Sequence, residues 1–91
     1  MADAAQVPGG YGPFEPVDAN TKAIFDKAMS GLLGVGYKPL IVATQVVAGT
    51  NYPYMCNAQV VAPGTTAYPV EVIIFQPLNG PPHLISIKRV P

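Results

Sequence analysis

Four apolar, β-branched segments joined by short links dominate the chain after residue 36. They cover residues 37–48, 51–61, 67–76 and 83–90. Parallel neighbours need a crossover of about a dozen or more residues, and none of these links is that long. The segments are therefore predicted to form an antiparallel meander, in which each strand pairs with the next one along the chain.

A single helix is predicted ahead of these strands. Asp18 is a suitable N-cap, because its carboxylate can accept hydrogen bonds from the free amides of the first turn. Apolar residues then recur at intervals of four, which is the spacing of one helical face. We expect the helix to end near residue 33, where glycines become frequent. The apolar face comprises Ala23, Ile24, Phe25, Ala28, Met29, Leu32 and Leu33, and Lys22, Asp26 and Lys27 cover the opposite side.

Together these elements predict an α+β fold, in which one amphipathic helix covers one face of an antiparallel sheet. The 91 residues fit one domain, and 49% of them are hydrophobic, which is enough for a single core. Residues 1–17 are rich in glycine and proline, and they are expected to form a flexible, extended arm. Two interpretations of its apolar residues stay open: Tyr11 and Phe14 pack back on the domain, or Val7 reaches into a partner.

Charge and cysteine content exclude several classes of protein. Five basic and five acidic residues give a formal net charge of zero, so neither nucleic acid nor a membrane is an expected partner. One cysteine and one histidine can close neither a disulfide nor a zinc site, and no metal or cofactor is predicted. The beginning of the chain lacks the pattern of a secretion signal, and no apolar run reaches the roughly 18 residues that cross a bilayer. A cytoplasmic protein is the expectation.

A catalytic role would need converging titratable groups. Cys56 and His83 are the only thiol–imidazole pair available, and strand alternation places Cys56 on the same face as Tyr54 and Ala58. We therefore expect a buried, inert thiol. The glycines at positions 9–12 lack the strand, the helix N-terminus and the lysine of a phosphate-binding loop. The chain is not predicted to be an enzyme, and a small enzyme using Cys56 and His83 is a third hypothesis behind the two given below.

Three apolar, weakly charged features stand out instead. They are the arm around Val7-Pro8-Gly9, the hairpin tip at residues 45–49 and the loop at residues 78–83. In a helix-on-meander fold the two tips lie at the same end of the sheet, and together with the arm they would form a wedge. Uncharged tips suit a dry interface, because burying a charge is costly. Ordinary strand packing explains the two valines of the first tip equally well, and turn chemistry alone accounts for the Asn-Gly pair of the second.

At these segments the sequence resembles the cystatin family, and specifically its single-domain, disulfide-free stefin type. Residues Gln45-Val46-Val47-Ala48-Gly49 are identical to the family's QVVAG hairpin, and Thr50-Asn51-Tyr52 continue it as in many stefins. Val7-Pro8-Gly9-Gly10 resembles the amino-terminal trunk of the stefins, and residues 72–78 lead into the second loop as they do in the family. The likeness runs from residue 7 to residue 90.

The resemblance implies a cystatin-like fold, with one helix packed on a four- to five-stranded antiparallel sheet. It also implies reversible, competitive, non-covalent inhibition of papain-like cysteine proteases of the cathepsin type by a monomer. In the family the trunk lies in the non-primed subsites, and the two hairpin tips enter the primed side without offering a scissile bond. Carried over to this chain, the residues that contact the protease are Val7, Pro8, Gly9 and Gly10 of the trunk, Gln45, Val46, Val47, Ala48 and Gly49 of the first tip, and Gly80, Pro81, Pro82 and His83 of the second loop.

Two other outcomes remain open. A non-inhibitory interaction module with the cystatin fold would have no reason to keep an apolar first tip. Members of the family also exchange the helix and the leading strands between two chains, with the first hairpin as the hinge. Such a domain-swapped dimer would straighten the tip and abolish inhibition.

Overall fold

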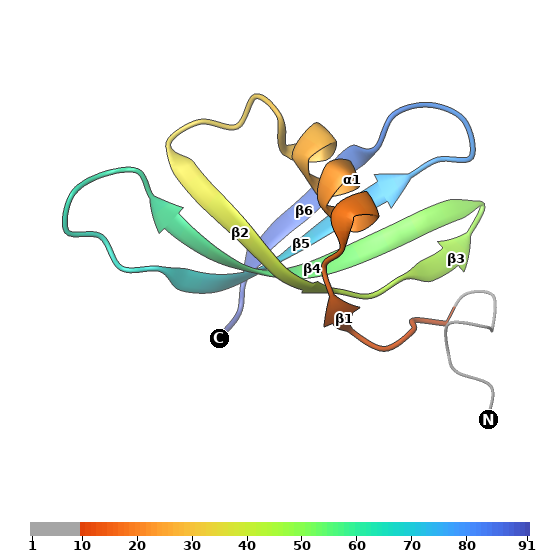
Figure 1. The fold of residues 1–91 in the computed structure, drawn as a ribbon, viewed down its shortest axis with the longest axis horizontal. Coiled ribbons are helices and arrows are strands. Elements are labelled where there is room, and N and C mark those ends of the chain that lie inside the picture. Colours follow the sequence, from red (N-terminus) through yellow and green to blue (C-terminus); the bar gives the residue numbers. More distant parts are fainter. Residues whose placement is uncertain (1–9) are drawn as a thin grey trace.

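The computed structural model, which describes residues 10–91, shows one helix lying across one face of a twisted antiparallel sheet (Figure 1). The strands are β1 (Glu15–Pro16), β2 (Val35–Val42), β3 (Gln45–Val47), β4 (Gly49–Val60), β5 (Tyr68–Gln76) and β6 (His83–Arg89), and the helix α1 spans Ala19–Met29. The sheet order is β1-β2-β4-β5-β6, and β3 pairs with the beginning of β4. The predicted α+β class and antiparallel meander are confirmed, and the arrangement is compatible with a cystatin-like fold.

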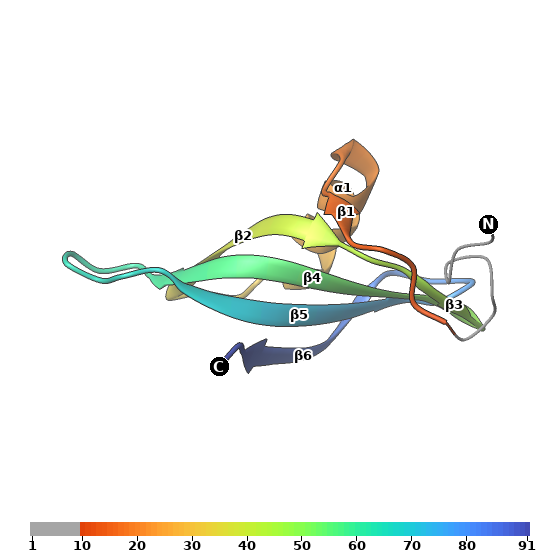
Figure 2. The ribbon, with the colours of Figure 1, turned by 90° about the horizontal axis from the view of Figure 1, so that it is seen from below.

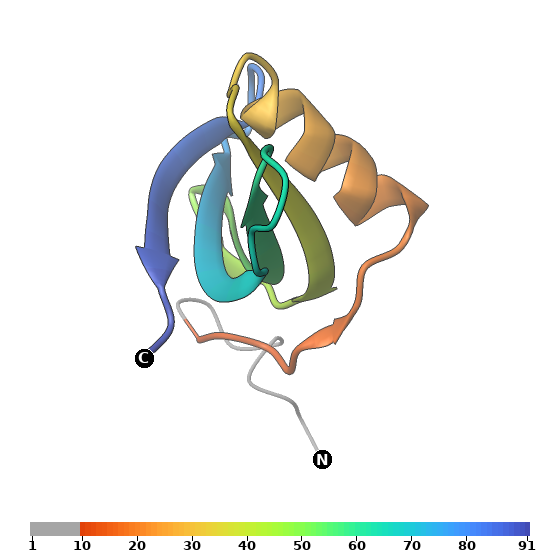
Figure 3. The same ribbon diagram turned by 90° about the vertical axis from the view of Figure 1, so that its left-hand side faces the viewer.

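The core lies between α1 and the sheet face that α1 covers, which Figure 3 shows from the end of the sheet. Phe25 is the buried residue of α1, and its ring meets that of Tyr54 edge to face, with 4.9 Å between the two centroids. The Tyr54 hydroxyl donates to the backbone carbonyl of Thr21 at 2.7 Å, so one side chain of β4 both packs under the helix and binds it. The strands contribute alternate residues to the core, as predicted. These buried residues are Val42, Tyr54, Cys56, Ala58, Val70, Val72 and Ile74.

The helix begins where the sequence predicts. The Asp18 carboxylate accepts from the Thr21 N–H at 2.8 Å, and the Thr21 hydroxyl accepts from the Asp18 N–H at 2.9 Å, which together form a capping box. The Thr21 N–H and the Thr21 hydroxyl, which also donates to Oδ1 at 2.9 Å, lower the pKa of Asp18 below its ordinary value, because both bonds favour the ionised carboxylate. On the exposed side Lys22 and Asp26, one helical turn apart, form an ion pair with 2.7 Å between nitrogen and oxygen.

The end of the helix differs from the prediction. α1 stops at Met29, because Ser30 takes up an extended backbone conformation and Gly31 a left-handed one with φ of 91°. Leu32 and Leu33 are therefore exposed, although the four-residue spacing assigned them to the buried face. The backbone conformations of Ser30 and Gly31 thus end the helix, although the apolar spacing continues to Leu33.

The predicted strand 37–48 is divided in two. β2 stops at Val42 and β3 begins at Gln45, yet β3 keeps the register along β4 that β2 has after its shift between Pro39 and Ile41. Pro53 of β4 lies opposite the interruption, and its carbonyl accepts from the Ala43 N–H at 3.0 Å. A proline has no N–H with which to return that bond. The break between β2 and β3 therefore results from one missing hydrogen bond to β4, and not from a turn. The other three strands lie within two residues of their predicted bounds.

The described part of the arm lies against the sheet. β1 pairs with the end of β2, and the Gly12 N–H donates to the Thr44 carbonyl at 2.8 Å. This stretch is extended, as predicted, but its attachment to the sheet was not predicted and replaces the expected flexible arm from residue 10 onward. Tyr11 and Phe14 stay 45% and 44% exposed, so neither enters the core. Within residues 10–91, no helix has the length and apolar character to span a membrane.

Candidate binding site at one end of the sheet

The described part of the arm, the β3–β4 tip and the β5–β6 loop meet at one end of the sheet. Thr50, directly after the first tip, pairs with Gln76, directly before the second loop. On the other side of β3, Tyr11 forms a bridge with Gln45. The three features therefore lie side by side, with the first tip in the middle. Figures 1 and 2 show them at the same end of the molecule from two directions.

The first tip depends on a glycine. Val47 pairs with Gly49, with Ala48 alone between them, and Gly49 reaches this geometry with φ of 110°. A Cβ atom built on Gly49 would lie 2.6 Å from the carbonyl oxygen of Gln76 and 2.8 Å from the Phe75 ring. Residues with side chains rarely adopt this φ, and here the space is closed as well. Glycine at this position therefore allows β4 to turn tightly against β5.

The side chains of the first tip point partly into solvent. Val46 is 46% exposed and Val47 is 43% exposed, and Ala48 is also exposed. Strand packing therefore accounts for only part of their apolar surface, and the rest is available to a partner. At the base of the tip the Asn51 side-chain amide donates to Oε1 of Gln45 at 2.9 Å, which ties the two strands together.

The second loop is held by one side chain. The Gln76 side-chain amide donates to the carbonyls of Gly80 at 2.8 Å and of Pro77 at 3.3 Å, so it spans the loop from inside. Gly80 has φ of 111°, and Leu78 at the loop's outer side is 78% exposed. Gly80, Pro81 and Pro82 also line a shallow hollow whose other wall is α1.

The sequence-predicted site residues are thus placed as follows. Gly10, Gln45, Val46, Val47, Ala48, Gly49, Gly80, Pro81, Pro82 and His83 all lie at this end of the sheet, with His83 as the exposed first residue of β6 opposite Phe75. Val7, Pro8 and Gly9 lie outside the described residues. Three supporting residues were not among the predicted contacts: Gln76, Asn51 and Gly12. Asn51 and Gln76 lie in segments that resemble the stefins, but nothing in the sequence indicated the hydrogen bonds that their side chains form.

The surface of this end carries no formal charge on its tips. Residues 10–14, 45–50 and 77–82 contain no acidic or basic side chain. A partner can therefore cover them without stripping water from an ion, which is the largest cost in burying a polar surface.

Cys56 and His83 are not brought together. Cys56 pairs with Val70 and His83 pairs with Phe75, so their partners on β5 are separated by about 16 Å at roughly 3.3 Å per residue. Cys56 is 2% exposed, and burial raises the pKa of its thiol to about 12. The hypothesis of a thiol–imidazole pair therefore has no geometric support. Residues 10–91 also hold no group of three or more side chains placed to bind a metal ion.

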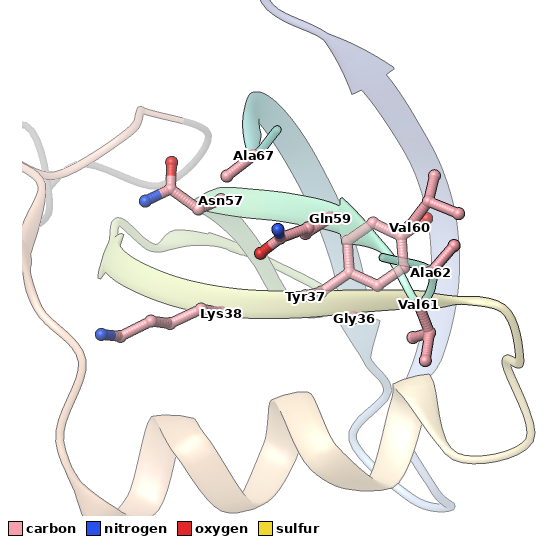
Figure 4. Close-up of a pocket in the computed structure, with 9 residues that line it drawn as sticks. All are labelled: Gly36, Tyr37, Lys38, Asn57, Gln59, Val60, Val61, Ala62 and Ala67. Carbon is pink, nitrogen blue, oxygen red and sulfur yellow. The ribbon is translucent and has the colours of Figure 1, made fainter. Parts of the chain in front are cut away.

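A second hollow lies towards the other end of the sheet (Figure 4). Lys38 and Asn57 extend to one side of it, and the Tyr37 ring lies at the other side, beside Val60. The amide of Gln59 is already engaged, because it donates to the Thr65 carbonyl at 2.8 Å. None of the described residues that line this hollow is a serine, cysteine, histidine, aspartate or glutamate.

No family model, no curated protein and no solved structure matches this chain. The cystatin resemblance therefore rests on the sequence segments quoted above, alongside an α+β arrangement that is compatible with it.

Proposed function

We propose that this chain is a reversible, competitive, non-covalent inhibitor of papain-like cysteine proteases. One observation carries the proposal: the first hairpin and the second loop, which resemble those of the stefins, lie side by side at one end of the sheet together with the described part of the arm, although more than 25 residues separate each from the next. An alignment of three uncharged projections forms a wedge of the kind that a protease cleft could accept.

The wedge is held in place before any partner binds. The described part of the arm is held by the Gly12–Thr44 hydrogen bond, the first tip by the Asn51–Gln45 bond, and the second loop by Gln76. A preformed surface loses little conformational entropy on binding, so a small apolar footprint can support tight association. Val46 and Val47 supply the exposed apolar area at the centre of this footprint.

The tips also explain why the chain would inhibit without being cut. A protease cleaves a segment that lies extended through its active site, whereas the first tip reverses direction within one residue between Val47 and Gly49. The close fit of Gly49 against Phe75 and Gln76 of β5 holds this turn in place. The tip can therefore fill the cleft next to the catalytic groups without presenting a peptide bond to them.

Titration of papain with the purified monomer tests the proposal. We expect an increase in apparent KM with unchanged kcat, recovery of activity on dilution, and an intact inhibitor mass after long incubation. Unchanged turnover at saturating concentrations of the folded monomer would contradict the proposal and favour the alternative of a non-inhibitory interaction module. Stoichiometric cleavage near residues 45–49 would identify a substrate and would contradict it as well. A size-exclusion step after heating separates the monomer from any domain-swapped dimer, which should be inactive.

A further inference from the structure

β6 is an edge strand that the proposed function does not use. It stands last in the sheet order, and within residues 10–91 no strand pairs with its outer side (Figure 3). The opposite edge is protected differently, because β1 covers the end of β2 and Pro39 lies in its exposed part. β6 contains no proline and has an uncharged centre, Leu84–Ile87. It is therefore the edge at which another extended segment can add to the sheet.

The direction of its backbone groups follows from one hydrogen bond. The Val90 N–H donates to the Pro69 carbonyl of β5 at 3.1 Å. In an antiparallel pair, alternate residues turn both their N–H and their C=O groups to the same side. Lys88 and Ser86 therefore bond inward to β5, and Ile87 and Arg89 present their N–H and C=O groups to the open edge.

The charges on this edge are all basic. Lys88 and Arg89 are two of the five cations of the chain, both are exposed, and β6 holds no acidic residue. The Arg89 guanidinium lies 3.9 Å from the centroid of the Tyr68 ring, which fixes its position. Glu71 lies opposite Lys88 on β5, and no ion pair joins these two described residues. The Lys88 ammonium is thus available to an acid on its outer side.

The same charges disfavour one pairing with a second copy of the chain. A twofold antiparallel pair that sets Ile87 opposite Arg89 of the second copy also sets Lys88 directly opposite its own equivalent, whereas a pair centred on Ile87 sets Lys88 opposite Ser86. Like charges facing each other across a strand pair are destabilising.

We propose that the outer edge of β6 binds an extended acidic segment of another protein by strand addition. The segment pairs antiparallel with Ile87 and Arg89 through main-chain hydrogen bonds, and it places an acidic side chain opposite Lys88 and an apolar one opposite Ile87. Main-chain bonds supply the attachment and the Lys88 contact supplies the preference for acid. This surface is separate from the hairpin tips, so the proposal stands independently of protease inhibition.

The test uses two synthetic peptides of the same length, acetyl-Ser-Val-Glu-Val-Glu-Val-Ser-amide and its counterpart with lysine in place of glutamate. Amide NMR spectra of the full chain are recorded during titration with each. We expect the glutamate peptide to shift the amide signals of residues 85–89 and to slow hydrogen exchange at Ile87 and Arg89. We expect the lysine peptide to bind about three- to tenfold more weakly.

Two sets of variants decide the mechanism. Lys88→Glu should reverse the preference between the two peptides. Arg89→Ala and Arg89→Pro both remove the cation, but only the proline also removes the outward N–H, so only Arg89→Pro should abolish the remaining binding. Because Lys88 is exposed, Lys88→Glu keeps the test valid if the proline variant does not fold. Equal binding of both peptides, shifts confined to other strands, or concentration-dependent dimerisation through β6 would each overturn the proposal.

Discussion

Gly49 and Gln76 fix the two hairpin projections against each other. The Cα of Gly49 approaches β5 so closely that an added Cβ would lie 2.6 Å from the Gln76 carbonyl oxygen, while the Gln76 side chain donates to the Gly80 carbonyl in the second loop at 2.8 Å. Gly49 of the first tip therefore packs against Gln76, whose side chain holds the second loop. A change at either residue is transmitted to both projections.

Gly49→Ala tests this relationship. The alanine would have to adopt φ of 110° and would displace the β5 backbone, so we expect a loss of about 2–3 kcal/mol in the free energy of unfolding and a marked loss of papain inhibition. Gly64→Ala is the matched control, because Gly64 also has positive φ but open space around it. It should cost about 1 kcal/mol and leave inhibition unchanged. Urea unfolding and inhibition constants measure both effects, and equal behaviour of the two variants would contradict the argument.

Val47→Asp tests the first tip as an interface. Val47 is 43% exposed, so the aspartate remains solvated in the free protein, but complex formation would bury its charge without a partner. We expect the inhibition constant for papain to rise about tenfold or more with no change in unfolding midpoint. Val61→Asp, at an exposed position beyond the end of β4, is the control and should inhibit normally. The interface assignment fails if the two variants inhibit equally well.

Deletion of residues 1–9 tests the predicted trunk contacts of Val7, Pro8 and Gly9. The sheet contacts of the remaining arm, including the Tyr11–Gln45 bridge, are retained in the truncated chain. We expect the fold to be unchanged and the complex with papain to dissociate faster, with little change in the association rate. Stopped-flow association and dilution-jump dissociation measure the two rates separately. An unchanged dissociation rate would remove the trunk from the site.

Tyr54→Phe tests the attachment of the helix to the sheet. The substitution keeps the ring against Phe25 but removes the hydrogen bond to the Thr21 carbonyl, at an expected cost of about 1–1.5 kcal/mol in stability. Tyr11→Phe, at a half-exposed position, should change stability by less than about 0.5 kcal/mol. Chemical denaturation of the three proteins under the same conditions provides the comparison. A Tyr54→Phe protein as stable as the parent would show that packing alone holds the helix.

The buried thiol predicts the alkaline behaviour of the protein. Burial raises the pKa of Cys56 from 9.0 to about 12 and also raises the pKa of Tyr54, so the folded state keeps both groups neutral longer than the unfolded chain does. The corresponding stability is fully present below about pH 9 and is lost as the pH rises towards 12. We expect the urea midpoint to fall between pH 8 and pH 10.5, and Cys56→Ala to be less stable at pH 8 but to show a smaller fall. Rapid, stoichiometric reaction of the native thiol with an aromatic disulfide reagent at pH 8 would contradict this description.

The sequence pattern predicted the helix and strands correctly wherever residues close in sequence set the backbone conformation. The Asp18 cap, the alternation that buries Tyr54 and Cys56, and the short links of the meander are all such cases. The prediction was wrong at the helix end, because Leu32 and Leu33 continue the apolar spacing after Ser30 and Gly31 have already turned the chain. It was also wrong in drawing one strand over residues 37–48, because the proline that interrupts the ladder stands on another strand.

The sequence by itself determined the fold class, since strand periodicity and link length are properties of consecutive residues. It also marked the three apolar segments, since their composition and motifs can be seen without coordinates. Only the tertiary structure decided that Tyr11 of the arm pairs beside the first tip, that Gly49 fits against Gln76, and that β6 keeps an open basic edge. The physical reason is that such relationships depend on pairing between strands that are distant in sequence. A residue more than twenty positions away does not affect the hydrophobic pattern of a segment, so that pattern cannot predict the pairing.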